Sequence, residues 1–316
     1  MAKLERVPPA AVVIEDLTIR YRKGKELFSA VDGLSMTMNA GEITSILGPN
    51  GAGKTSTIEA CEGFRRPTSG TIRVFDLDPV RDAVQLRPRV GVMLQEGGAW
   101  LGVRAGELLR YVASLYANPL DVPALLERLD LQDHAQTNFR RLSGGQRQRL
   151  CLAMAIVGRS DLVFLDEPTA GMDPHSRRAT WDIIRELRDG GAGVVLSTHH
   201  MDEAESLSDR IHILKDGRLA ASGTPTDLLR ESRNPLLELS VNGELDLVAL
   251  ARAVPELNKV VDAVAGLYSF DVKPSTEIMA RVASWCVDHR IELRGIRTHE
   301  PTLEELFLSL TKRVEQ

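Results

Sequence analysis

The sequence contains little cysteine, and its cysteines are not arranged as pairs. The 316 residues include Cys61, Cys151 and Cys286, which lie far apart and form no C-x-x-C or Cys/His motif. An odd number without such spacing argues against a disulfide framework and a zinc site. The seven histidines likewise lack metal-ligand spacing. We therefore expect a protein of a reducing compartment, in which the cysteines are small core residues.

Long hydrophobic runs are also absent. No stretch approaches the roughly 20 apolar residues that cross a bilayer, and the N-terminal segment has no apolar core for a signal peptide. We therefore predict a cytoplasmic protein that contacts a membrane only through a partner. An excess of positive charge is missing too, because the net charge is -5 and the isoelectric point is about 5.9. This charge disfavours nucleic acid as a partner.

The composition that remains is that of an ordinary globular protein. Hydrophobic residues make up 43% of the chain and charged residues 26%. Single hydrophobic cores rarely grow beyond ~250 residues, so a chain of 316 residues is expected to form two domains. We place a large domain at 1–230 and a small one at 235–316, joined by a linker at 231–235.

The large domain has the periodicity of an α/β fold. Apolar and polar residues alternate roughly with a period of two at 12–21 and 31–38. This pattern is typical of antiparallel strands with one exposed face. Other short apolar runs do not alternate, as expected for parallel strands covered on both faces. These runs are 42–47, 89–95, 162–166 and 194–198. Between the runs at 89–95 and 162–166 the apolar residues have helical spacing. One apolar stripe is formed by Leu108, Leu109, Val112 and Leu115.

The small domain is expected to be an α+β sandwich. Its pattern predicts a strand, a helix, two strands, a helix, a strand and a closing helix. The first six segments are 237–241, 245–254, 259–265, 268–272, 276–289 and 292–297. Thr302 and Glu305 form a capping box that starts the closing helix. This domain contains no chemical motif.

A glycine-rich motif, Gly-Pro-Asn-Gly-Ala-Gly-Lys-Thr, occupies residues 48–55. It fits the phosphate-loop pattern G-x-x-x-x-G-K-[ST] and lies between a predicted strand and a predicted helix. Glycine lets backbone N–H groups approach a triphosphate, Lys54 adds a positive charge, and Thr55 offers a hydroxyl to Mg²⁺. The predicted ATP contacts are Gly48, Pro49, Asn50, Gly51, Ala52, Gly53, Lys54, Thr55 and Ser56.

Two carboxylates follow a predicted buried strand, at Asp166 and Glu167. A buried carboxylate is costly unless it meets a cation, so Asp166 is predicted to hold Mg²⁺. Glu167 is predicted to be the general base that accepts a proton from the water attacking ATP. The structural alternative is that this pair only caps the following helix.

A third motif, Leu-Ser-Gly-Gly-Gln at 142–146, precedes these acids; we call it the signature segment. Together the three motifs resemble the ATP-binding-cassette (ABC) ATPases over about residues 10–230. The resemblance implies a P-loop cassette with a parallel core sheet, an antiparallel β subdomain and a helical subdomain at about 96–160. Taken alone, the signature segment would be an ordinary helix with a serine cap.

The resemblance also implies roles for single residues. Gln95 would contact Mg²⁺ or the attacking water, His199 would contact the γ-phosphate, and Asp173 would lie in a loop that connects two ATP sites. Tyr21 matches the aromatic residue on which adenine stacks, although a tyrosine at a strand end can also be a core residue. Four residues would bind the ATP held by a second copy, so that two cassettes close over two nucleotides: Ser143, Gly144, Gly145 and Gln146.

Two further stretches, 59–70 and 301–311, resemble the drug-resistance branch of the family, typified by daunorubicin exporters. That resemblance implies an ATPase that drives a separate integral membrane permease at the cytoplasmic face of the membrane, with residues from 235 onward in assembly or regulation. The loop at 96–102 is the predicted docking groove, unless Trp100 packs between the two lobes. The alternatives are an exporter of lipid or polysaccharide, or an importer.

Overall fold

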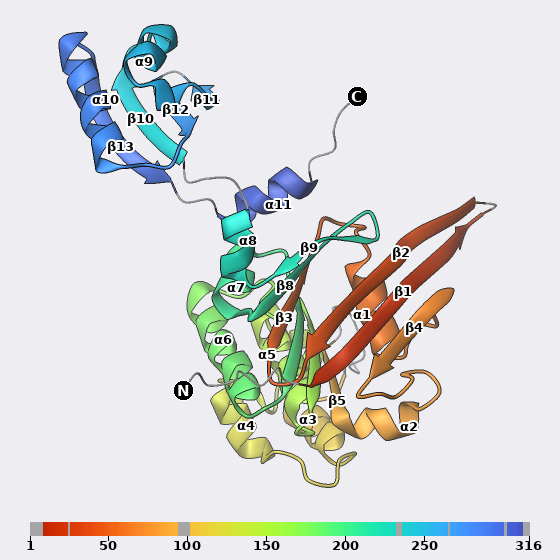
Figure 1. Cartoon of the computed structure of the whole chain (residues 1–316). Helices are drawn as coiled ribbons and strands as arrows, with labels where there is room; N and C mark the ends of the chain where they lie inside the picture. The colour runs from red at the N-terminus through yellow and green to blue at the C-terminus, as the bar shows by residue number, and fades with distance from the viewer. Residues whose placement is uncertain are drawn as a thin grey trace, which may run out of the picture. The chain divides into compact units, whose positions relative to one another are not determined.

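The chain forms two units, each with its own hydrophobic core. The structure, a computed structural model, describes residues 9–24, 26–93, 102–231, 236–264, 266–299 and 302–311. The first unit comprises Met1–Pro225 with Leu310–Gln316, and the second comprises Thr226–Ser309. Figure 1 shows the course of the chain through both.

A six-stranded sheet forms the centre of the first unit, in the order β5-β6-β7-β3-β8-β9. All its neighbouring strands are parallel except β8 and β9. Every residue of β3, β6 and β7 is buried, as expected for non-alternating apolar runs. The strands are β3 (Ile43–Leu47), β5 (Val90–Met93), β6 (Leu162–Asp166), β7 (Gly193–Ser197), β8 (Arg210–Lys215) and β9 (Arg218–Gly223).

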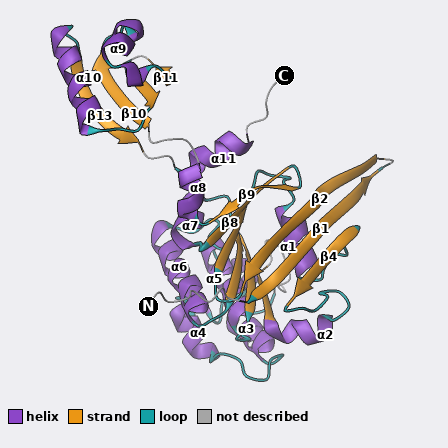
Figure 2. Ribbon diagram, viewed as in Figure 1, coloured by secondary structure: helices purple, strands orange, loops and turns teal. Residues whose placement is uncertain are grey.

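Helices flank this sheet, as the purple and orange ribbons of Figure 2 show. Four of them are α1 (Lys54–Cys61), α5 (Gly144–Ile156), α6 (Pro174–Asp189) and α7 (Met201–Leu207). Between β5 and α5 lie the elements of the helical segment: α3 (Ala105–Ala113), α4 (Val122–Arg128) and two 3₁₀ turns, η2 (Gln132–His134) and η3 (Phe139–Arg141). Helix α3 buries Leu108 and Leu109, whereas Leu115 lies beyond its end and is 67% exposed, so the assignment of Leu115 to the apolar stripe of this helix was wrong.

A second, antiparallel sheet packs beside the first in this unit. It joins β1 (Ala10–Lys23), β2 (Glu26–Asn39) and β4 (Ser69–Val74) in the order β2-β1-β4. Strand β2 alternates buried Leu34, Met36 and Met38 with exposed residues, which confirms the predicted exposed face. Two short elements follow β4, namely α2 (Ala83–Leu86) and η1 (Arg87–Arg89).

The second unit has the strand and helix order of a ferredoxin-like fold. Its antiparallel sheet has the order β11-β12-β10-β13, and α9 and α10 pack against the apolar face of β10. Its elements are β10 (Leu236–Asn242), α9 (Leu247–Ala253), η4 (Pro255–Leu257), β11 (Val260–Val264), β12 (Leu267–Asp271), α10 (Thr276–Asp288) and β13 (Glu292–His299). The helices α8 (Pro225–Glu231) and α11 (Leu303–Thr311) complete the chain.

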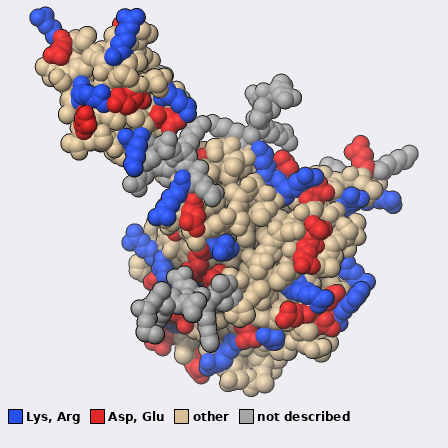
Figure 3. Space-filling model, in the orientation of Figure 1, with Lys and Arg blue, Asp and Glu red and all other residues tan. Residues whose placement is uncertain are grey.

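The predicted fold class, α/β with a small α+β domain, is confirmed by this architecture. Within the described ranges, no helix has the length and apolarity that a membrane span requires. On the face drawn in Figure 3, the described Lys and Arg side chains are interspersed with Asp and Glu, so no large field of one charge covers it.

Candidate functional site

The glycine-rich loop turns sharply between the end of β3 and the start of α1. Gly53 precedes α1 with φ +99°, a backbone conformation that favours glycine. A Cβ atom added there would lie 2.4 Å from the Ala30 carbonyl oxygen, so position 53 has no room for a side chain. The start of α1 therefore presents backbone N–H groups at the carboxyl edge of the central sheet, which suits a phosphate.

Lys54, the first residue of α1, folds back over this loop. Its Nζ donates hydrogen bonds to the Gly48 carbonyl at 2.6 Å and the Pro49 carbonyl at 3.2 Å. Burial lowers the pKa of Lys54, while the nearby charges of Glu167 and Asp166 act in the opposite direction. The site thus brings one cation and two acids together at one sheet edge.

Asp166 is the last residue of β6 and is buried. Its Oδ1 accepts a hydrogen bond from the Ser197 hydroxyl on β7. Burial raises the pKa of Asp166, and the Ser197 hydrogen bond opposes that rise. A buried carboxylate of this kind gains from a cation placed beside it.

Glu167 follows in a strained backbone conformation, with φ 49°. A left-handed conformation at a residue other than glycine costs about 1–3 kcal/mol and is typical of functional sites. The Glu167 N–H donates to the Ser197 carbonyl at 3.0 Å, and its Oε1 is hydrogen-bonded to His199 Nδ1 at 3.0 Å. The predicted general base and the predicted γ-phosphate sensor are therefore in contact.

The glycine-rich loop, Asp166 and Glu167 line a cavity of about 350 Å³, whereas His199 does not line it. It lies between the glycine-rich loop, the ends of β1 and β2, and the end of β6. Its lining residues are Tyr21, Phe28, Ala30, Asn50, Gly51, Gly53, Lys54, Thr55, Ser56, Asp166 and Glu167. Residues that are 145 positions apart in the sequence, from Tyr21 to Asp166, thus enclose one space.

Tyr21 lies at the side of this cavity with its hydroxyl hydrogen-bonded to Ser56 Oγ at 2.8 Å. The Arg65 guanidinium covers one face of its ring, 4.5 Å from the ring centre. Phe28 pairs with Tyr21 across the β1–β2 hairpin and is 56% exposed. The sequence analysis missed Phe28, because only the register of the hairpin places it beside Tyr21.

The signature segment lies at the N-terminus of α5. Ser143 caps the helix: its Oγ accepts from the Gln146 N–H at 3.2 Å, and its own N–H donates to Gln146 Oε1 at 2.9 Å. Gly144 and Gly145 are the first two residues of α5. None of these four residues lines the 350 Å³ cavity of the same chain.

Asp173 caps a different helix, α6. It accepts hydrogen bonds from the N–H groups of His175 and Ser176, and from the Ser176 hydroxyl at 2.6 Å. The Ser176 hydrogen bonds hold the pKa of Asp173 at about 2. Asp173 does not line the cavity either, and its predicted role between two sites stays a prediction. Gln95 and Trp100 lie outside the described residues.

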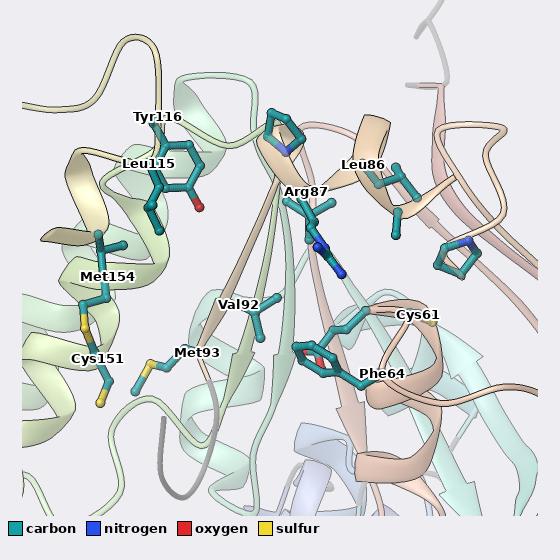
Figure 4. A pocket seen from close by; sticks show the side chains of 17 residues that line it. Cys61, Phe64, Leu86, Arg87, Val92, Met93, Leu115, Tyr116, Cys151 and Met154 are labelled. Atoms are coloured by element: carbon teal, nitrogen blue, oxygen red, sulfur yellow. The ribbon is translucent and has the colours of Figure 1, made fainter. Parts of the chain in front are cut away.

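A second, apolar groove of about 570 Å³ lies elsewhere in the first unit (Figure 4). Val92 and Met93 of β5 lie between its two walls. One wall is formed by Leu115, Tyr116, Cys151 and Met154, and the other by Cys61, Phe64, Leu86 and Arg87. Burial raises the pKa of Glu62 in this groove to about 8, so at neutral pH its carboxyl adds little charge.

Comparisons with known proteins agree with this geometry. Residues 31–170 match the family model described as ABC transporter. The daunorubicin resistance ATP-binding protein DrrA3 of Streptomyces coeruleorubidus is 35% identical over 95% of this chain and 96% of its own length. The human retinal-specific phospholipid-transporting ATPase ABCA4 is 41% identical over 62% of this chain, but over 9% of its own length.

A solved structure of an ATP-binding subunit of an ABC transporter has a similar fold. It superposes with a TM-score of 0.63 at 26% identity and covers 70% of this chain and 92% of its own. A relative at 35% identity matches almost the whole chain, and the P-loop and the paired acids meet in one cavity. The chain therefore belongs to the ABC transporter family, as one of its ATP-binding, ATP-hydrolysing subunits.

Proposed function

We propose that the chain hydrolyses ATP to drive an exporter that expels an antibiotic or drug through a separate membrane permease. The observation that carries the proposal is the 350 Å³ cavity, in which a phosphate-binding loop faces two carboxylates. A triphosphate brings about four negative charges, which the loop N–H groups and Lys54 would compensate.

Asp166 and Thr55 fit a magnesium ion in this cavity. Mg²⁺ prefers oxygen ligands and is usually held by one or two carboxylates together with substrate phosphates. Asp166 offers a buried carboxylate and Thr55 a hydroxyl, both on the cavity surface. Among the described residues, no group of three or more His, Cys, Asp or Glu side chains could hold a metal alone, so phosphate oxygens would complete the set. Bound there, the ion would neutralise charge on the phosphates, and Gln95 is a further proposed ligand.

Glu167 is the proposed proton acceptor. Water attacks the γ-phosphorus and passes a proton to the Glu167 carboxylate, while the bond from the γ-phosphorus to the β,γ-bridging oxygen breaks to give ADP and phosphate. His199 holds Glu167 Oε1 at 3.0 Å and would orient it. The glycine-rich loop and Tyr21 would hold the nucleotide in place, with Ser56 supporting the Tyr21 hydroxyl.

Two copies of the chain are proposed to act together. Ser143, Gly144, Gly145 and Gln146 lie at the N-terminus of a 13-residue helix, where N–H groups favour a phosphate. They do not line their own cavity, so they can serve the cavity of a second copy in a symmetric dimer. Asp173 is proposed to lie near the contact between the two copies.

The permease is proposed to dock in the apolar groove and to hold the chain at the cytoplasmic face of the membrane. Two large side chains on opposite walls are unusually exposed, Phe64 at 65% and Leu115 at 67%. Exposed apolar surface of this kind is typical of a protein interface. The residues that line this groove include none of the predicted docking loop at 96–102, of which the structure describes only Gly102.

Drug export is favoured over lipid export because the daunorubicin resistance relative matches more of the chain than ABCA4 does. ABCA4 is 41% identical over 62% of the chain, and this favours a phospholipid as the second candidate substrate. The daunorubicin resistance relative, however, matches through the C-terminal unit as well, over 95% of the chain. We assign that unit, from residue 235 onward, to assembly or regulation of an exporter.

Replacing Glu167 by Gln tests the proposal. The variant should bind ATP as before but hydrolyse it about 1,000-fold more slowly, because only the proton acceptor is lost. Cells that express it with the permease should accumulate a fluorescent anthracycline to the level of cells without the transporter. Normal turnover by the variant would contradict the role of Glu167. Export of labelled phospholipid instead of drug by the wild-type transporter would favour phospholipid as the substrate.

A further inference from the structure

One hydrogen bond joins the helix of the signature segment to the backbone of Glu167. Gln148, in the first half of α5, is half-buried and donates from its Nε2 to the Glu167 carbonyl oxygen at 2.8 Å. The two residues belong to different elements, since Glu167 follows β6. The bond therefore links two parts of the first unit that are 19 residues apart.

The Glu167 backbone needs such support because its φ of 49° is unfavourable for a residue with a side chain. Its N–H donates to the Ser197 carbonyl at 3.0 Å, and its carbonyl also accepts from the Ala170 N–H at 3.1 Å. Those two bonds join main-chain groups, so they do not depend on which side chains are present. The bond from Gln148 does depend on a side chain, and a substitution can remove it alone.

The backbone conformation decides where the Glu167 carboxylate points. The direction of the Cα–Cβ bond follows the backbone, and from it the carboxylate reaches the cavity and lies 3.0 Å from His199 Nδ1. Relaxation of the backbone to a common conformation would turn the carboxylate away from this contact. A general base must lie within hydrogen-bond reach of the proton it accepts.

We propose that Gln148 is a positioning residue for Glu167: its amide holds the Glu167 carbonyl and keeps the backbone that directs the carboxylate into the ATP cavity. Gln148 does not line that cavity, so it acts through Glu167 and not on ATP. The inference rests on the proposed role of Glu167 as proton acceptor. The signature segment, at the N-terminus of α5, is proposed to contact the ATP of a second copy. The bond from Gln148 therefore connects this segment with Glu167, which is proposed to act on the ATP bound by the same chain.

Two substitutions remove the amide donor while keeping the length of the side chain, Gln148→Met and Gln148→Glu. We expect each variant to hydrolyse ATP about 10- to 100-fold more slowly, because a displacement of about 1 Å costs that much. The dissociation constant of ATP should stay unchanged, since no ATP contact is lost. Melting curves identify a variant that fails to fold, and the other variant then carries the test. Arg149→Met is the matched control on α5, because the Arg149 side chain pairs with Asp130 Oδ2 at 2.9 Å, and its turnover should change little.

Combining Gln148→Met with Glu167→Gln distinguishes positioning from a general structural effect. Single-turnover rates of the double variant should equal those of Glu167→Gln alone, because the positioned carboxylate is already gone. Two results would overturn the positioning role only. One is an additional slowing in the double variant, and the other is normal turnover by both Gln148 variants while Glu167→Gln is inactive. Normal turnover by Glu167→Gln itself would contradict the proposed function, and the positioning role with it.

Discussion

At the scale of single residues, the proposed ATP site depends on charges that stabilise one another. Burial lowers the pKa of Lys54 and raises that of Asp166, so each ionised form is disfavoured on its own. Each charge compensates part of the other's burial. A substitution at Lys54 should therefore also change the ionisation of Asp166, and effects on phosphate and metal binding should appear together.

Phe28 offers a prediction at this scale. Its ring lines the cavity beside Tyr21, one face of which is already covered by Arg65. Replacing Phe28 by Ala should weaken ATP binding about tenfold, because stacking of a base on an aromatic ring contributes about 1–3 kcal/mol. Titration calorimetry measures the dissociation constant. Leu27→Ala is the control, since Leu27 is 67% exposed and does not line the cavity. Equal affinities of the two variants for ATP would contradict a contact between Phe28 and the nucleotide.

The sequence alone could predict most of the candidate site at this scale. The glycine-rich loop, Lys54, Asp166 and Glu167 come from local motifs, and they meet in one cavity. Phe28 and Gln148 could not be found in this way, because their positions depend on strand register and on helix packing. The roles of all these residues in catalysis stay predictions.

At the scale of elements, a buried histidine contributes a hydrogen bond between the two sheets of the first unit. His212 of β8 is buried and donates from Nε2 to the Thr37 carbonyl of β2 at 3.1 Å. Burial lowers its pKa to about 4, with a smaller contribution from Arg210. The imidazole is thus neutral in the folded protein over a pH range in which an exposed histidine carries a charge.

This shift gives a prediction for stability. Below pH 6.5 the unfolded chain takes up a proton at His212, whereas the folded chain does so only near pH 4. The free energy of unfolding should therefore fall by about 3 kcal/mol as the pH decreases from 6.5 to 4, and stay unaffected above pH 6.5. Urea denaturation at several pH values, with hydrogen exchange at β8, measures this dependence. His212→Gln should flatten it, and the exposed control His175→Gln should not. Parallel curves for the wild type and His212→Gln would contradict the assignment.

Periodicity explains which elements could be predicted. The non-alternating runs at 42–47, 162–166 and 194–198 correspond to β3, β6 and β7. The alternating runs at 12–21 and 31–38 lie in β1 and β2. The sequence analysis assigned no strand to β4 or β8. β4 is six residues long and is defined by its pairing with β1, and a contact of that kind is not encoded in local spacing. All seven segments predicted for the small domain are present, and the six that were given bounds end within a few residues of the predicted ends.

At the scale of the whole molecule, the chain has surfaces that a single copy does not use. The signature segment does not line the 350 Å³ cavity of its own chain, and the apolar groove of the first unit has exposed walls. The sequence could suggest both partners only through the family resemblance, because neither a docking groove nor a shared site has a local pattern. The proposed second copy and the proposed permease would cover these two surfaces.

The groove gives a prediction for the complex. Leu115→Asp places a charge on one wall and should reduce recovery of the chain with membranes that contain its permease, because burying an unpaired charge is costly. Basal ATP hydrolysis should stay unchanged, since Leu115 lies outside the ATP cavity. Val84→Asp is the control, because Val84 is 84% exposed and does not line the groove. Co-sedimentation measures the recovery, and unaltered recovery of Leu115→Asp would place the docking surface elsewhere.

A mixing experiment tests most directly whether two copies share each ATP site. Lys54→Ala disables the loop of one chain and Ser143→Arg disables the signature segment of another, so each variant alone should be inactive. In a mixed dimer, the intact loop of one chain meets the intact signature segment of the other, and an equal mixture should recover roughly a quarter of the wild-type turnover. A mixture no more active than its components, or full turnover by Ser143→Arg alone, would contradict the shared site.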